Sequence, residues 1–149
     1  DSVDSFIKYY NKTYRLIDTA GLRKKNKVED SIEYYSTVRT YRVIDECDIA
    51  IVMLDSAKEF GKQDQDIIRR IIAKGKGMVV VVNKWDLIEK DTDTMKDFIE
   101  EMVHRYPGIS HYPILFTSVT ERIIEFKFSI RKEILRPLGQ IFIGHVLST

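Results

Sequence analysis

The sequence predicts an α/β domain of three layers, in which helices cover a mostly parallel sheet. The first indication is that apolar runs alternate with amphipathic stretches; residues 49–55 and 78–82 are continuous apolar runs of the kind found in buried parallel strands. The second is that two polar motifs, Asp-x-x-Gly and Asn-Lys-x-Asp, each directly follow a run that reads as a strand. Both motifs therefore fall at carboxyl ends of strands, where sheets of this class bind ligands.

The first part of the chain is expected to form a hairpin, a helix and a strand. Residues 3–10 and 13–18 read as two strands joined by a short turn at Asn11-Lys12. A helix is expected over residues 30–46, and residues 49–55 form the next strand. The apolar residues that lie roughly along one stripe of this helix are Ile32, Tyr35, Val38 and Ile44.

The second part continues the alternation. We expect a helix over residues 64–74, a strand over 78–82, a helix that begins at Thr92 or Asp93 and runs to Tyr106, and a last strand over 114–117. The inward residues of the first of these helices are expected to be Ile67, Ile68, Ile71 and Ile72.

The residues after 120 allow two interpretations. One set alternates as in a strand, namely Ile124, Phe126, Phe128 and Ile130. Another set has helical spacing, namely Ile123, Phe126, Ile130 and Ile134. We expect a helix to about residue 135, ended by Pro137, because the last strand needs a helix over it. The domain is then predicted to span residues 1–136, with a divergent segment of unknown structure over 137–149.

Composition is ordinary for a globular protein and narrows the functional classes. The 149 residues are 44% hydrophobic and 32% charged, with a net charge of +1, so no global charge draws the chain to nucleic acid or membrane. A single cysteine, Cys47, excludes an internal disulfide and suggests a reducing, cytoplasmic location. No apolar run approaches the roughly 20 residues of a membrane span. The three histidines lack metal-ligand spacing.

The most informative motif is Asn83-Lys84-Trp85-Asp86, directly after the strand at 78–82. A carboxylate at Asp86 can accept two parallel hydrogen bonds from the ring N–H and the exocyclic amine of guanine, a contact that adenine cannot reproduce. The stem of Lys84 would lie along the base and ribose, and Asn83 would tie the loop to its neighbours. The motif therefore indicates recognition of a guanine nucleotide.

Two weaker motifs support this interpretation. Asp18 and Gly21 end the predicted second strand in Asp-Thr-Ala-Gly, which resembles the Asp-x-x-Gly motif of GTPases. That resemblance implies that the carboxylate lies near a magnesium ion, usually through water, and that the glycine N–H approaches the γ-phosphate. Ser118 and Val119 follow the last strand, where a backbone N–H would point at the guanine carbonyl. Val119 departs from the usual Ser-Ala pattern at this place.

The chain resembles the second GTPase domain of the Der (EngA) family. The resemblance covers about residues 1–120 and is clearest over residues 14–28, 34–44 and 82–91. It implies a P-loop-NTPase-type GTPase domain that binds GTP or GDP with Mg²⁺. Members of that family are tandem GTPases that assist assembly of the large ribosomal subunit, so the implied partners are that subunit or its RNA. Potassium stimulates members of the family. The resemblance implies no membrane partner.

The sequence departs from the family in several respects. It contains no Gly-x-x-x-x-Gly-Lys-Ser/Thr phosphate loop and no switch threonine. Leu22, within the stretch that resembles the family, stands where Ras-type GTPases orient water with Gln. We therefore expect a domain missing its first strand and phosphate loop, about 40 residues in all, with no GTP hydrolysis by this chain alone. Loss of that strand is expected to expose two apolar strand edges in the middle of the sheet. The RNA-binding domain that follows in the family is not recognisable here.

Alternatives remain at this point. The chain could be a pseudo-GTPase that acts as a scaffold, or a receiver-like phosphoacceptor that uses Asp18 or Asp55; the latter leaves the Asn-Lys-x-Asp motif unexplained. Asp55 is otherwise expected to cap a turn. The basic residues Arg23, Lys24, Lys25 and Lys27 are expected to contact a partner such as ribosomal RNA, or else to form a solvated loop. The oligomeric state is not predicted.

Overall fold

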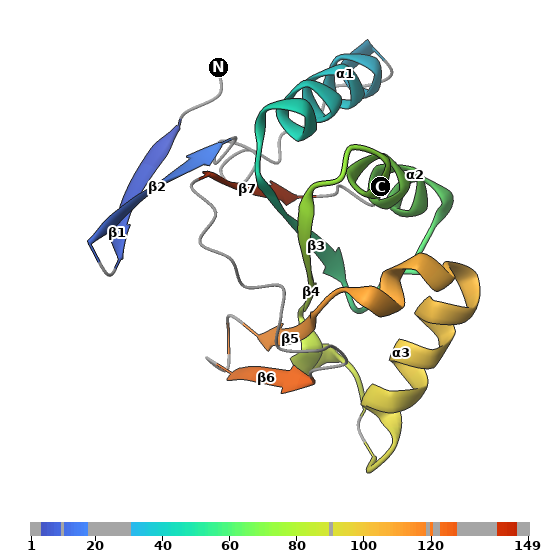
Figure 1. Cartoon of the computed structure of the whole chain (residues 1–149). Helices are drawn as coiled ribbons and strands as arrows, with labels where there is room; N and C mark the ends of the chain where they lie inside the picture. The colour runs from blue at the N-terminus through green and yellow to red at the C-terminus, as the bar shows by residue number, and fades with distance from the viewer. Residues whose placement is uncertain are drawn as a thin grey trace.

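The computed structural model describes residues 4–9, 11–17, 31–89, 91–118, 120, 123–127 and 140–145, with the backbone alone described for 31–37, 123–127 and 140–145 (Figure 1). Its helices and strands, in chain order, are β1 (Ser5–Tyr9), β2 (Lys12–Ile17), α1 (Ser31–Glu46), β3 (Ile49–Asp55), α2 (Lys62–Ala73), β4 (Gly77–Asn83), the 3-10 helix η2 (Trp85–Leu87), α3 (Thr94–Arg105), the 3-10 helix η3 (Pro107–His111), β5 (Ile114–Ser118), β6 (Ile123–Lys127) and β7 (Gln140–His145).

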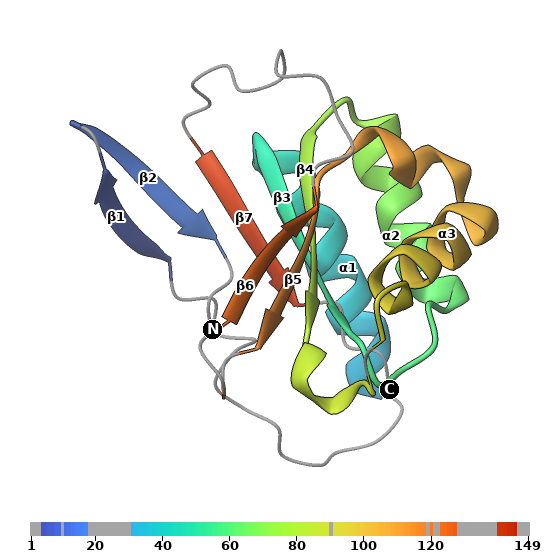
Figure 2. The ribbon, with the colours of Figure 1, turned by 90° about the horizontal axis from the view of Figure 1, so that it is seen from below.

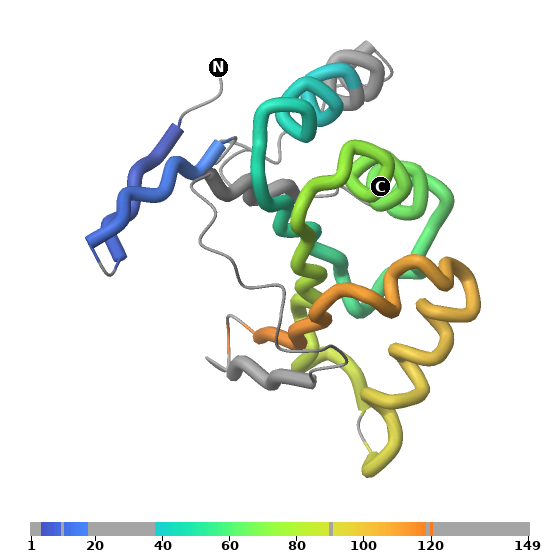
Figure 3. Tube along the Cα trace, viewed as in Figure 1, coloured from blue at the N-terminus to red at the C-terminus, as the bar shows by residue number. Residues whose placement is uncertain are grey.

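The described strands form one sheet in the order β1-β2-β7-β3-β4-β5-β6. The inner pairs are parallel, and the two outer pairs, β1 with β2 and β5 with β6, are antiparallel. The chain passes from β3 through α2 to β4, and then through α3 to β5 (Figure 3). The described helices α1, α2 and α3 lie on one face of the sheet (Figures 1 and 2). The predicted α/β class with a mostly parallel sheet is confirmed, and the described residues supply two of its layers.

Alternate residues of β3 and β4 build the core. The helix-facing positions are buried: Ala50, Val52 and Leu54 on β3, and Met78, Val80 and Val82 on β4. They belong to one apolar cluster with helix residues that include Ile44, Ile67, Ile68, Ile71 and Met102. The intervening residues of both strands are only partly buried. The sequence predicts that these strands are buried on both faces. The described helices cover one face only, so they bury every second side chain.

A glycine turn links α2 to β4. Gly75 has φ 65°, the left-handed conformation that a glycine adopts without a Cβ clash. Its N–H donates to the carbonyl of Ile72 at 2.9 Å, and the N–H of Lys76 donates to the carbonyl of Ile71 at 3.2 Å. These two bonds satisfy carbonyls that the end of a helix leaves unpaired. The turn ends α2 and directs the chain into β4.

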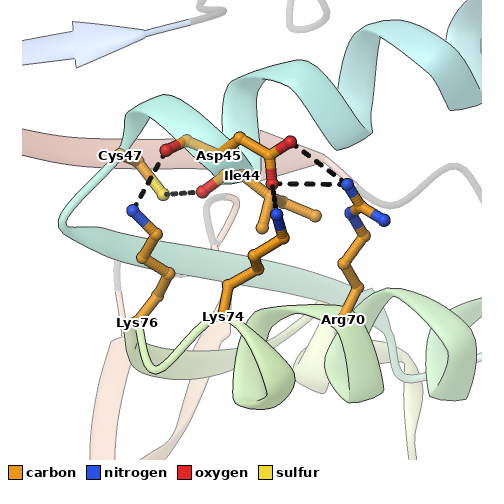
Figure 4. A network of polar contacts seen from close by, with 6 residues as sticks. All are labelled: Ile44, Asp45, Cys47, Arg70, Lys74 and Lys76. Atoms are coloured by element: carbon orange, nitrogen blue, oxygen red, sulfur yellow. Dashed lines mark hydrogen bonds and ion pairs between the residues drawn. The ribbon is translucent and has the colours of Figure 1, made fainter.

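A polar network joins the carboxyl-terminal ends of α1 and α2 (Figure 4). The carboxylate of Asp45 accepts a hydrogen bond from Arg70 Nη2 at 3.1 Å and pairs with Lys74 Nζ at 3.0 Å. Lys76 Nζ donates to the Asp45 carbonyl at 3.1 Å. Cys47 lies one residue beyond α1 and is completely buried, which raises the pKa of its thiol to about 11. Its complete burial makes it a packing residue.

The hairpin of β1 and β2 stands apart from the helical layer (Figures 1 and 2). Its turn places Asn11 at φ 59°, a conformation that asparagine tolerates better than most residues. Phe6, Ile7 and Tyr9 are exposed, whereas Leu16 and Ile17 at the end of β2 are buried. The hairpin is as predicted, and only its inner end reaches the core.

Strand β7 corrects one expectation. It pairs in parallel with β2 over Arg15–Ile17 and with β3 over Ile49–Met53, so it lies between them in the middle of the sheet. The two strand edges that were expected to be open are therefore paired. β7 lies within residues 137–149, for which the sequence predicts no structure.

Strand β6 corrects a second expectation. Residues 123–127 form a strand that pairs antiparallel with β5, from Ser118 opposite Ile123 to Ile114 opposite Lys127, whereas a helix was expected there. The outer edge of β5 offers unpaired backbone groups, and the alternating apolar residues at 124 and 126 suit a strand. The remainder of that expected helix lies outside the described residues.

Every helix in the described part of the chain is too short or too polar to cross a bilayer.

Candidate functional site

The candidate site lies where β3, β4 and β5 end side by side. The parallel register places Asp55 of β3 opposite Asn83 of β4, and Val82 of β4 opposite Phe116 of β5. The polar residues at the ends of these three strands therefore lie at the same edge of the sheet. The Asn-Lys-x-Asp motif, which follows the middle strand, is flanked by the ends of both neighbours.

Lys84 makes the sharp turn from β4 into η2. Its backbone is left-handed, with φ 61° and ψ 32°, which is uncommon for a residue with a side chain. Its carbonyl accepts hydrogen bonds from Ser56 Oγ at 2.7 Å and from the N–H of Leu87 at 3.0 Å. The N–H of Ser56 also donates to the carbonyl of Asn83 at 2.9 Å. The end of β3 thus holds the turn in a conformation that it would not readily adopt alone.

The end of β5 holds the two other motif side chains. Thr117 Oγ1 donates to Asn83 Oδ1 at 3.1 Å, and Ser118 Oγ donates to Asp86 Oδ1 at 2.5 Å. Ser118 is buried and Asp86 is partly exposed. The Asp86 carboxylate is therefore anchored to β5 and still reaches the surface.

The end of β3 holds the Lys84 side chain. Lys84 Nζ donates to Asp55 Oδ2 at 2.5 Å, and the N–H of Ala57 donates to Asp55 Oδ1 at 3.0 Å. Burial raises the pKa of Asp55, but the bonds from Lys84 and Ala57 outweigh burial and hold the pKa below its ordinary value. Asp55 therefore caps a turn, as expected, and in addition carries an ion pair that sequence analysis did not foresee.

Trp85, at the variable position of the motif, anchors the loop in the core. It is 2% exposed, and its ring lies 4.4 Å from that of Phe116 and 5.5 Å from that of Phe98 on α3. Edge-on and tilted ring pairs of this kind are favourable. The neighbouring Asp86 therefore lies on a segment that the packing of Trp85 fixes to the core.

This arrangement is suited to bind a planar, donor-rich ligand edge. A carboxylate has about four acceptor positions, so the bond from Ser118 leaves capacity for two more donors at Asp86. The methylene stem of Lys84 offers apolar surface beside it. A guanine base has both features that these two side chains would recognise, a pair of adjacent N–H donors and a flat face.

Of the predicted site residues, the structure brings together Asn83, Lys84, Asp86 and Ser118. Asp18, Gly21 and Val119 lie outside the described residues, as does the basic cluster at 23–27. In the described part of the chain, no group of three acidic, histidine or cysteine side chains could hold a metal ion. The Mg²⁺ expectation, which rests on Asp18, stays a prediction.

Sequence reasoning missed Ser56 and Thr117, both of which bond to the motif. Each is a small hydroxyl residue at the end of a strand adjacent to β4, and that position was the only available signal. It also left the role of Trp85 open.

Comparisons with known proteins indicate the class of protein that this chain resembles. A family model described as 50S ribosome-binding GTPase matches residues 1–84. GTPase Der of Chlorobaculum parvum is 47% identical over 118 residues, which are 79% of this chain and 27% of that protein. GTPase Der of Finegoldia magna is 43% identical over 81% of this chain, and that of Chlorobium luteolum is 40% identical over 90% of it. The chain spans 27–31% of the length of these relatives.

Proposed function

This chain belongs to the family of 50S ribosome-binding GTPases, and on that premise we propose that it binds guanine nucleotides through the loop of residues 83–86. Similarity to GTPase Der over most of the chain supports the same class. The proposal concerns binding. Hydrolysis is not part of it, because the sequence contains no Gly-x-x-x-x-Gly-Lys-Ser/Thr motif.

The observation that carries the proposal is the 2.5 Å hydrogen bond from Ser118 Oγ to Asp86 Oδ1. It fixes the carboxylate in one orientation before any ligand arrives, so less conformational entropy is lost on binding. Asn83 is fixed in the same way by Thr117. Asp86 then accepts the ring N–H and the exocyclic amine of guanine, and Lys84 covers the base.

The remaining nucleotide contacts are proposed from sequence. Asp18 would hold Mg²⁺ through water, and the N–H of Gly21 would approach the γ-phosphate. The backbone N–H of Val119 would face the guanine carbonyl. Mg²⁺ would neutralise phosphate charge when the nucleotide is bound.

The proposed macromolecular partner is the large ribosomal subunit or its RNA, in line with the description of the family. Arg23, Lys24, Lys25 and Lys27 would supply phosphate contacts. Co-migration with the large subunit in a sucrose gradient, with and without GTP, tests this part separately.

The test of base recognition is the substitution Asp86→Asn. The wild-type chain should bind GDP in preference to xanthosine diphosphate. The variant should bind GDP about 10- to 100-fold more weakly, because it loses charge-assisted hydrogen bonds, and it should shift its preference toward xanthine, which offers a carbonyl where guanine has an amine. Competition titration with a fluorescent GDP analogue measures both effects.

The matched control is Asp97→Asn, which removes a carboxylate from the exposed first turn of α3. It should leave both affinities unchanged. If Asp86→Asn retains the wild-type preference for guanine over xanthine, the assignment of the base site is wrong.

A further inference from the structure

Lys84 is held at its side chain by Asp55, the last residue of β3, and at its backbone by Ser56, which directly follows that strand. Its carbonyl accepts from Ser56 Oγ at 2.7 Å, and its ammonium donates to Asp55 Oδ2 at 2.5 Å. Ser56 is 5% exposed, and the side chain of Asp55 is 16% exposed. These contacts lie at the end of β3, outside the motif.

We propose that Asp55 is a positioning residue for the nucleotide base, acting through its ion pair with Lys84; this inference rests on the proposed guanine-binding function. Asp55 does not touch the base. It sets where the Lys84 side chain lies before the nucleotide arrives.

The strand order explains how Asp55 sets the position of the Lys84 side chain relative to Asp86. β4 lies between β3 and β5, so Asp55 draws the Lys84 ammonium toward one side while Ser118 holds Asp86 on the other. The two side chains that are proposed to contact the base are thereby held apart. A lysine that was free to rotate would spend only part of its time beside the face of the base.

Asp55 is itself immobilised, which makes it an effective anchor. Its second oxygen accepts the N–H of Ala57 at 3.0 Å, so the carboxylate is fixed at both oxygens. Lys84 remains 47% exposed, so its stem is accessible to a ligand while its ammonium is held. Lysine has many rotamers in solution, and restricting them beforehand lowers the entropic cost of binding.

The substitution Asp55→Asn tests the ion pair with Lys84 separately from the turn that Asp55 caps. The amide oxygen of asparagine can still accept the N–H of Ala57, but its NH₂ group would face the Lys84 ammonium and cannot accept from it. The variant should therefore keep the turn and lose the anchor. The matched control is Asp66→Asn, which removes a carboxylate from an exposed ion pair with Arg69 on α2.

We expect Asp55→Asn to lower the affinity of the chain for GDP and for xanthosine diphosphate by the same factor, about 3- to 10-fold. This is the range that ordering one long side chain would produce. Asp86→Asn, in contrast, changes the ratio of the two affinities. In a Lys84→Met background, Asp55→Asn should have no further effect, because the group through which it acts is gone. Asp66→Asn should change neither affinity.

Three results would overturn the proposal. An unchanged GDP affinity in Asp55→Asn would show that the ion pair positions nothing. An equal loss in the Lys84→Met background would show that Asp55 acts by another route. If the wild-type chain fails to bind GDP at all, both this proposal and the proposed function fail; GDP binding that is sensitive to Asp86→Asn but not to Asp55→Asn overturns this one alone.

Discussion

Phe6 on β1 and Phe116 on β5 are the same residue type in strands of the same sheet, yet Phe6 is 69% exposed and Phe116 is 0% exposed. β1 belongs to a hairpin at one end of the sheet, with no described helix over it, whereas β5 lies beside β4 under the helical layer (Figure 1). Both strands are rich in apolar residues. What separates them is coverage by other elements, because a strand buries only the face against which something packs.

The two regions also differ in how firmly they are joined to the sheet. β3 and β4 pair along their whole length, from Ile49 opposite Gly77 to Asp55 opposite Asn83. β2 pairs with β7 only over Arg15–Ile17, and no described pairing joins β2 directly to β3. The candidate site lies in the well-packed region. A side chain such as Asp86 can hold a fixed geometry there, because the strand before it, β4, and both neighbouring strands are anchored.

The comparison can be tested most strongly with one substitution at two places. Phe116→Ala should lower the free energy of unfolding by about 3–5 kcal/mol, because it leaves a cavity against Trp85 and Phe98. Phe6→Ala should change it by less than about 0.5 kcal/mol, since the ring is already in water. Urea unfolding followed by Trp85 fluorescence measures both. Similar losses at the two sites would mean that the hairpin packs on something that the described residues do not include.

The role of β7 is tested by Phe142→Pro. Position 142 pairs with Ile17 on one side and Ala50 on the other, and proline removes the N–H of a strand that is paired at both edges. The local cost should be about 3 kcal/mol or more. Hydrogen exchange should show loss of protection at β2 and β3, with protection at β5 retained.

The control for this experiment is Phe142→Tyr, which keeps the backbone N–H and an aromatic ring. It should leave exchange at β2 unchanged. Should Phe142→Pro also leave β2 protected, the pairing of β7 between β2 and β3 would be contradicted.

A smaller effect is expected at Asp64, in the first turn of α2. Asp64 is 3% exposed; its Oδ2 accepts the N–H of Gly61 at 2.9 Å, and its Oδ1 has no partner among the described residues. Burial raises the pKa of this carboxyl, and the bond from Gly61 offsets only part of that rise. The raised pKa means that the protonated form favours folding. Its contribution is present below the unfolded pKa of about 3.9 and is lost as pH rises through the folded value.

Asp64→Asn should therefore be more stable than the wild type at neutral pH, by an amount that shrinks as pH falls toward 4. Asparagine keeps an acceptor for Gly61 and carries no charge. Asp64→Ala should instead lose about 1 kcal/mol, because the N–H of Gly61 loses its partner. Urea unfolding at a series of pH values distinguishes the two. A stability gap between wild type and Asp64→Asn that does not vary with pH would contradict a buried, titrating carboxyl.

Much of the helical region was predictable from local pattern. The strands at β3, β4 and β5 and the helices α1, α2 and α3 agree with expectation to within a few residues, because apolar runs and amphipathic stretches there alternate clearly. The meeting of Asn83, Asp86 and Ser118 followed from the same reasoning, since parallel strands present their carboxyl ends at one edge. Ser56 and Asp55 were not assigned to this loop, because their contact with Lys84 depends on the detailed turn geometry at the end of β3.

The class of the domain and the order of its helices and strands from α1 to β5 could be assigned from the sequence alone, as could the meeting of Asn83, Asp86 and Ser118 after β4. Those features depend on residue periodicity and on motifs a few residues long. Only the tertiary structure decided that residues 123–127 extend the sheet beside β5, and that β7 lies between β2 and β3. A short apolar segment can join whichever strand edge is open to it, and the open edges are a property of the assembled sheet.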